Sequence, residues 1–152
     1  MEIEKRLREE GIILPEVSKP IAAYIPGKKS SNLVFTSGQL PLENGVVKYT
    51  GRVGQELSLE KGQAAARLAV INCLAIVKSI AGSWDAVEEI IKITGYIQCG
   101  PDFFQQAQVL NGASEFLQQV CGENGQHARS AVGVASLPLN AAVEIEMIAR
   151  LK

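Results

Sequence analysis

The residues best suited to chemistry lie near the C-terminus of the chain. Arg129 leads into a predicted strand at residues 130–136, and Glu144 and Glu146 fall in a second predicted strand at 142–151. Alternate residues of the second strand are apolar, so the two carboxylates share its other face. A planar guanidinium binds a carboxylate through two parallel hydrogen bonds, and a carboxylate side chain orients or deprotonates water. A Leu-Pro-Leu-Asn turn between the strands predicts a hairpin with one polar edge.

Few other chemical groups are available. The sequence contains no phosphate-binding loop, GxGxxG, HExxH or GxSxG motif. His127 is the sole histidine, which excludes chemistry that needs two. The three cysteines lie in apolar runs without a CxxC pair, so no metal site is predicted and each thiol is expected to be a small buried hydrophobe: Cys73, Cys99 and Cys121.

Composition narrows the class of protein. A chain of 152 residues with 47% hydrophobic and 20% charged residues is expected to form about one globular domain. Its net charge of −1 and the lack of a Lys/Arg stripe disfavour nucleic-acid binding. The N-terminus, MEIEKRLREE, is too charged for a signal peptide, and we count no apolar run of transmembrane length. With unpaired cysteines, these features predict a cytoplasmic protein without membrane association.

The first half of the chain predicts short elements. A helix is expected at residues 2–10, with an apolar stripe of Ile3 and Leu7 so narrow that it should pack weakly or against another subunit. Residues 12–31 contain three prolines and read as an extended arm and loop. A strand follows at 32–37, and residues 46–49 are expected to form a hairpin strand after an Asn-Gly turn.

Two long helices are predicted to cover one face of a mixed sheet. The first is capped by Ser58 and runs to about residue 81; its second half is so apolar that we expect cover on more than one side, with an oligomer contact as one candidate cause. A strand is predicted at 90–99. The second helix, 101–120, contains Asn111-Gly112, which costs ~1 kcal/mol in a helix and suggests a reason beyond folding; a hairpin turn is the alternative there. The order of these strands and helices along the chain predicts an α+β fold.

Two segments resemble a known family. TSGQLP at residues 36–41 and ARSAVGVASLPLNAAVEIEMIA at 128–149 are similar to the signatures of the Rid family of reactive intermediate deaminases, also called YjgF or L-PSP. The likeness runs from residue 18 to the C-terminus, so 18–152 is read as one family domain and 1–17 as an added N-terminal helix and arm. The resemblance implies a chorismate-mutase-like fold and a homotrimer with clefts between subunits.

The resemblance also implies an activity and a site. Active members hydrolyse enamine or imine intermediates, of the 2-aminoacrylate or 2-iminobutanoate type, to 2-keto acids and ammonia without a cofactor. By position, Arg129 would hold the carboxylate of the small metabolite and Glu144 would direct water. The other residues that the match assigns are the strand-end Ser37 as a catalytic residue and four substrate contacts: Tyr24, Gly38, Asn111 and Ala131.

Plainer roles stay open at each position. The plainer role of Arg129 is a solvated strand-end residue, and that of Glu144 is a surface strand residue paired with Arg150, while Glu146 competes with Glu144. The remaining plain roles are the start of a turn for Ser37, interface packing for Tyr24 and a helix irregularity for Asn111. The sequence also departs from the family's active members, with Ala131 where they carry cysteine, Gly133 where they carry glutamate, and Ala22-Ala23 for Gly-Pro. Two other functions follow from the same resemblance: a non-catalytic trimer that binds a small carboxylate, and the ribonuclease that the family's older names suggest.

Overall fold

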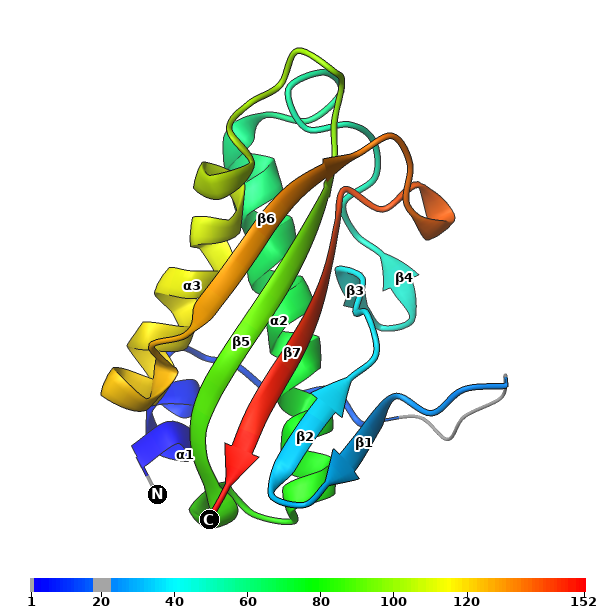
Figure 1. Ribbon diagram of the computed structural model, residues 1–152. Coiled ribbons are helices and arrows are strands. Elements are labelled where there is room, and N and C mark those ends of the chain that lie inside the picture. Colours follow the sequence, from blue (N-terminus) through cyan, green and yellow to red (C-terminus); the bar gives the residue numbers. More distant parts are fainter. Residues whose placement is uncertain (1, 18–22) are drawn as a thin grey trace.

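The computed structural model describes residues 2–17 and 23–152, arranged as a mixed sheet with helices on one face (Figure 1). The main sheet has the strand order β1-β2-β7-β5-β6, and β3 and β4 form a separate ribbon. The strands are β1 (Gly27–Ser30), β2 (Leu33–Thr36), β3 (Leu42–Glu43), β4 (Val46–Val47), β5 (Val87–Gln98), β6 (Ala128–Val134) and β7 (Val143–Leu151); the helices are α1 (Glu2–Glu9), α2 (Leu59–Ala81) and α3 (Gln106–Cys121). The predicted α+β architecture is confirmed.

The predicted C-terminal hairpin is wrong. In this described part of the chain, β6 and β7 do not pair with each other, because both pair with β5. β5 and β6 run parallel, with Ile93 opposite Arg129, whereas β5 and β7 run antiparallel, with Tyr96 opposite Glu144. The unit β5-α3-β6 is a crossover connection, which returns the chain parallel to the strand that it left. The Leu-Pro-Leu-Asn segment then carries the chain past β5 to β7.

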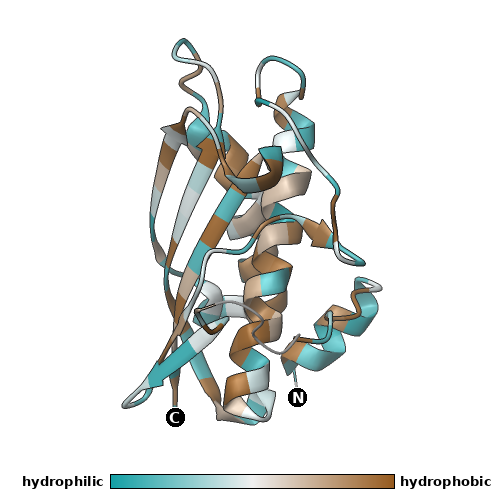
Figure 2. Ribbon diagram, turned by 90° about the vertical axis from the view of Figure 1, so that its right-hand side faces the viewer, coloured by the Kyte–Doolittle hydropathy of each residue, from teal (hydrophilic) through white to brown (hydrophobic). Residues whose placement is uncertain are grey.

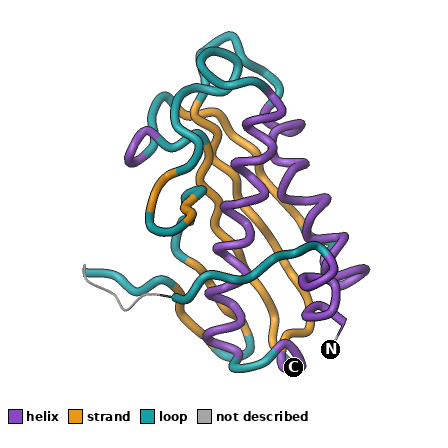
Figure 3. Tube along the Cα trace, turned by 180° about the vertical axis from the view of Figure 1, so that it is seen from behind, coloured by secondary structure: helices purple, strands orange, loops and turns teal. Residues whose placement is uncertain are grey.

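α2 begins and ends as its sequence predicted. The Ser58 hydroxyl accepts a hydrogen bond from the Lys61 backbone N–H at 3.2 Å, and Gly82 ends the helix with φ 83°. Its extra apolar surface is covered by this same chain: the arm after α1 crosses α2 (Figure 3), and Leu14, Pro15 and Val17 line a groove with Ala75. The apolar residues of α2 thus lie between sheet and arm (Figure 2).

α2 is long and apolar enough to span a membrane, contrary to our reading that no run reaches that length. Most of the helix is buried inside the domain, which is how a core helix passes the same test.

α1 packs on its own chain rather than weakly or on another subunit. Ile3 and Leu7 are 7% and 4% exposed and belong to the main core. The helix lies beside the end of α3, where Glu10 just beyond it accepts a hydrogen bond from Gln119 at 2.5 Å. The division of the chain at residues 17 and 18 stays a prediction, because residues 18–22 lie outside the described part; Ala22 of the Ala22-Ala23 pair is among them.

α3 begins at Gln106, five residues later than predicted, because residues 101–105 form a turn and loop. The helix continues through Asn111-Gly112, which confirms helix over hairpin turn. Gly112 has a packing reason: a Cβ there would overlap the backbone carbonyl of Gln63 on α2. The glycine therefore allows the two helices to approach closely, and only Asn111 remains for a functional role.

Candidate functional site

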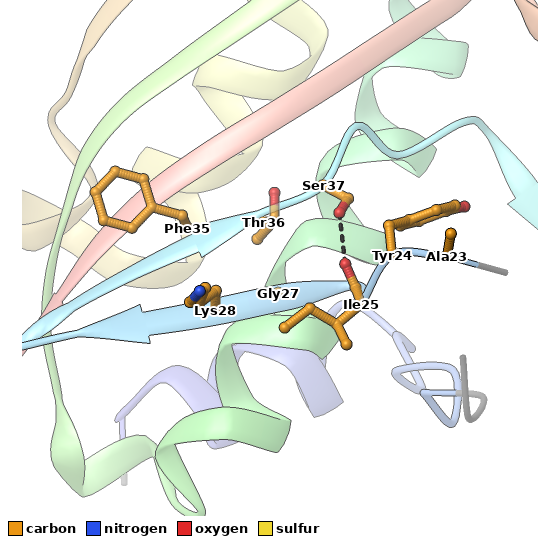
Figure 4. Close-up of a pocket in the computed structure, with 8 residues that line it drawn as sticks. All are labelled: Ala23, Tyr24, Ile25, Gly27, Lys28, Phe35, Thr36 and Ser37. Atoms are coloured by element: carbon orange, nitrogen blue, oxygen red, sulfur yellow. Dashed lines mark hydrogen bonds between the residues drawn. The ribbon is translucent and has the colours of Figure 1, made fainter. Parts of the chain in front are cut away.

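Four of the predicted site residues gather where β2 ends; we call Tyr24, Ser37, Gly38 and Glu144 the glutamate cluster. The Ser37 hydroxyl donates to the Ile25 carbonyl at 2.7 Å, and the Ser37 backbone N–H donates to the Pro26 carbonyl at 2.7 Å. These bonds tie the segment that carries Tyr24 to the end of β2 (Figure 4). Because its proton is used, Ser37 faces a ligand as an acceptor.

Glu144 lies directly against Gly38. A Cβ on Gly38 would overlap the Glu144 carboxylate, so the glycine leaves the space that this carboxylate occupies. The next residues lock this contact, since Gln39 and Ile145 exchange backbone hydrogen bonds of 2.7 and 2.9 Å. Burial raises the pKa of Glu144 above its ordinary 4.5, and the nearby charge of Glu146 raises it further. A carboxylate held in this way is suited to exchange protons with water.

Glu146 forms a hydrogen bond with another residue on the same sheet face. It accepts a hydrogen bond from the Tyr96 hydroxyl at 3.1 Å. Burial raises the pKa of Tyr96, and the hydrogen bond to Glu146 adds to this effect. Of the two competing carboxylates, Glu144 is the one that lies against Gly38, the residue after Ser37.

A hollow of about 580 Å³ opens beside this cluster (Figure 4). Tyr24 and Ser37 line it, but neither Glu144 nor Arg129 does. Tyr24 is 66% exposed at its rim. The hollow is therefore one wall of a site rather than a complete pocket.

The arginine lies elsewhere, in a group that we call the arginine cluster: Asn111, Ser114, His127 and Arg129. Arg129 donates through Nη1 to the Ser114 hydroxyl at 3.1 Å and through Nη2 to the Ala107 carbonyl at 3.3 Å. Residues 107, 111 and 114 follow helical spacing on one face of α3, so Asn111 lies between these two attachment points. Arg129 is thus attached to α3 and is not a freely solvated strand-end residue.

Ser114 and His127 belong to the arginine cluster, and neither was assigned to the site from the sequence. His127 Nε2 lies 2.8 Å from the Ser114 hydroxyl oxygen, and His127 Nδ1 lies 2.6 Å from the Gly125 carbonyl. Burial lowers the pKa of His127; the hydrogen bond to Gly125 opposes this effect and the charge of Arg129 adds to it. The available signals were a lone histidine two residues before Arg129 and a serine three residues after Asn111.

The two clusters lie on opposite faces of the sheet in one chain. Arg129 pairs with the buried Ile93, which places its side chain on the helix side, whereas Glu144 pairs with Tyr96 on the open side. β5 also separates their strands. Ala131 belongs with Arg129, since it shares the alternate positions of β6. Among the residues that the structure describes, no group of three His, Cys, Asp or Glu side chains is arranged to hold a metal ion.

Comparisons with known proteins identify the family. A profile described as "YjgF/chorismate_mutase-like, putative endoribonuclease" matches residues 4–151. The chain belongs to the YjgF/chorismate mutase-like family. Among solved structures, the Agrobacterium tumefaciens protein Atu1372, of unknown function, is 43% identical with a TM-score of 0.92, over 99% of this chain and 94% of that one. The YjgF fold inferred from the resemblance is therefore confirmed.

Two relatives with named functions share less sequence identity with this chain. The 2-iminobutanoate/2-iminopropanoate deaminase of Salmonella typhimurium is 35% identical over 85% of this chain and 88% of that protein. The structure of Escherichia coli TdcF with bound serine is 30% identical, with a TM-score of 0.63, over 90% of this chain and 98% of that one. The family thus includes reactive intermediate deaminases.

Proposed function

We propose that this YjgF-family protein hydrolyses reactive enamine or imine intermediates, of the 2-aminoacrylate or 2-iminobutanoate type, to 2-keto acids and ammonia. The observation that carries the proposal is the half-buried Glu144 carboxylate against Gly38, with its raised pKa. A protein that only binds carboxylates needs no such group. The similarity to a named 2-iminobutanoate/2-iminopropanoate deaminase supports the same reaction.

We further propose that the complete site forms between copies of the chain in a homotrimer. Because Arg129 and Glu144 lie on opposite sheet faces, one copy cannot place both on a substrate of three or four carbons. One subunit would supply the arginine cluster with Ala131, and its neighbour would supply the glutamate cluster. A closed cyclic arrangement repeats such a contact once per subunit.

The chemistry then needs only these side chains. Arg129 binds the substrate carboxylate, and Glu144 takes a proton from water as its oxygen bonds to the imine carbon. Glu144 returns that proton to nitrogen, which gives a carbinolamine. It then takes the proton of the carbinolamine hydroxyl and passes it to the same nitrogen, so that the carbon–nitrogen bond breaks and ammonia leaves as the carbonyl forms. The Ser37 oxygen is free to accept the imine N–H. Because imines already react with water, positioning supplies much of the rate gain.

The decisive experiment measures release of ammonia and keto acid. An upstream enzyme would generate 2-iminobutanoate or 2-aminoacrylate in the same tube, with Arg129→Ala as the inactive control. We expect release faster than in buffer with the wild-type chain only. Equal rates for wild type, variant and buffer on both substrates would reject this deaminase activity.

The composite site predicts complementation between two inactive variants. Arg129→Ala keeps Glu144, and Glu144→Gln keeps Arg129, so a mixed trimer contains one site with both groups intact. After unfolding and refolding together in equal amounts, the pair should recover about a quarter of wild-type activity, as random closed trimers require. Each variant refolded alone is the control. Recovery no greater than the sum of the controls would place both residues in one subunit's site.

The raised pKa of Glu144 predicts the pH dependence. The water-activating form is the ionised one, so activity should rise with pH through a pKa above 4.5. The charge of Glu146 contributes to this shift, so Glu146→Gln should move the acid limb to lower pH and leave the plateau rate within about threefold. The measurement is kcat/KM from pH 4 to about 8 with a pH-tolerant generating system. An unmoved acid limb in Glu146→Gln would assign it to another group.

A second candidate is a trimer that binds a small carboxylate without turnover. The serine bound in the TdcF structure favours it, since that relative holds an amino acid. The ribonuclease alternative lacks such support, because 15 basic and 16 acidic residues provide no cationic excess for a phosphate backbone.

For the cellular location we propose the cytoplasm, on the basis of three buried, unpaired thiols.

A further inference from the structure

We propose that Ser114 and His127 are positioning residues, which hold the Arg129 guanidinium ready for the substrate carboxylate. The inference rests on the proposed function, because it assigns Arg129 the carboxylate. Neither residue is required to touch the substrate. Their role would be to fix the orientation of the group that does.

With a neutral His127, the hydrogen bonds of this group have only one consistent direction. A guanidinium donates and never accepts, so the Ser114 oxygen must accept from Arg129 Nη1 at 3.1 Å. The Ser114 proton then points to His127 Nε2 at 2.8 Å, which must be unprotonated to accept it. His127 Nδ1 carries the ring proton and donates to the Gly125 carbonyl at 2.6 Å. Each bond determines the next, from the loop before β6 to the arginine.

The location of the group makes it rigid. Ser114 is only 9% exposed on α3, and Gly125 is buried in the loop that precedes β6. A Cβ on Gly125 would overlap the Leu117 carbonyl, so this loop lies directly on α3. His127 therefore joins two backbone segments that are already packed together. Burial and the charge of Arg129 both lower the pKa of His127, which favours the neutral imidazole that this arrangement needs.

Arg129 gains orientation from this arrangement. The bonds to Ser114 and Ala107 use one N–H on each terminal nitrogen, which leaves the other three of its five N–H groups for a ligand. An arginine side chain that is free to rotate loses conformational entropy when it is fixed, which weakens binding by up to about thirtyfold. Because α3 already fixes it, this loss is avoided when the carboxylate binds.

The test compares Ser114→Ala and His127→Phe with His127→Gln, whose amide oxygen can still accept from Ser114. Ser79→Ala, an exposed helical serine on α2, is the matched control. The first two variants should raise the Kd for 2-oxobutanoate about five- to thirtyfold, because the freed guanidinium must be ordered again when the carboxylate binds. KM should rise equally with kcat unchanged, because the carboxylate is held alike in ground and transition states. His127→Gln should recover most of the affinity.

A measurement on the free protein separates this inference from the proposed function. Nitrogen relaxation of the Arg129 guanidinium should report a rigid side chain in the wild type and a mobile one in Ser114→Ala. If no imine is hydrolysed, the deaminase proposal fails, but the mobility of the Arg129 side chain still tests the positioning role independently. Unchanged Arg129 mobility and an unchanged Kd in correctly folded Ser114→Ala would overturn the positioning role. So would a loss in His127→Phe that His127→Gln does not reduce.

Discussion

Glu144→Gln is expected to lower kcat by about 10²- to 10⁴-fold, the usual contribution of a positioned acid–base group. Glutamine keeps nearly the same shape, so the contact with Gly38 and the fold should persist. It cannot accept a proton from water, so addition to the imine carbon loses its base. The measurement is single-turnover release of keto acid, together with the Kd for 2-oxobutanoate, which should change little.

Glu146→Gln is the matched control for this substitution. It stands two residues further along the same face of β7 and is occupied by Tyr96. Its plateau rate should stay within about threefold of the wild type, in line with the pH prediction above. Full activity in Glu144→Gln would show that Glu144 does not act as the base. A larger loss of activity in Glu146→Gln than in Glu144→Gln would assign that role to Glu146.

Arg129→Ala is expected to lower kcat/KM by about 10²- to 10⁴-fold, because two charge-assisted hydrogen bonds of roughly 1.5–3 kcal/mol each are removed. Arg129→Lys keeps the charge but cannot make the planar pair of bonds, so it should recover only a small part of the loss. Calorimetric titration with 2-oxobutanoate measures the binding contribution directly. The substitution should leave α3 folded, since its core residues do not depend on Arg129.

Arg150→Ala provides the comparison for charge. This arginine is on β7 and pairs with Glu88 at 2.7 Å on the protein surface. Its loss should change kcat/KM by less than about twofold, as exposed ion pairs contribute little. Tight keto-acid binding in Arg129→Ala would mean that another group holds the carboxylate, and equal losses in both variants would indicate a general effect of net charge.

Local patterns predicted most elements of the fold. Ser58 and Gly82 defined α2 because capping depends on a few adjacent backbone groups. Alternation placed Val143, Ile145 and Met147 on the buried face of β7 for a similarly local reason. The start of α3 was placed too early because a proline permits a first turn without requiring one.

Pairing of distant segments was beyond local patterns. The hairpin prediction assumed that neighbouring strands pair, whereas β5 lies between β6 and β7. The apolar excess of α2 indicated an extra covering layer, but only the folded chain showed that its own arm supplies it. Likewise, Gly112 was noticed as costly, and its reason required the backbone of Gln63 in place.

For the candidate site, the sequence by itself determined which residues to consider, because the TSGQLP and ARSAVGV segments resemble the signatures of a family to which the chain belongs. Only the tertiary structure decided how they are divided: Arg129 attached to α3 through Ser114, and Glu144 against Gly38 on the opposite sheet face. The physical reason is the two-residue period of a strand combined with its register. Which face a side chain occupies depends on the strand it pairs with, and that partner is distant in sequence.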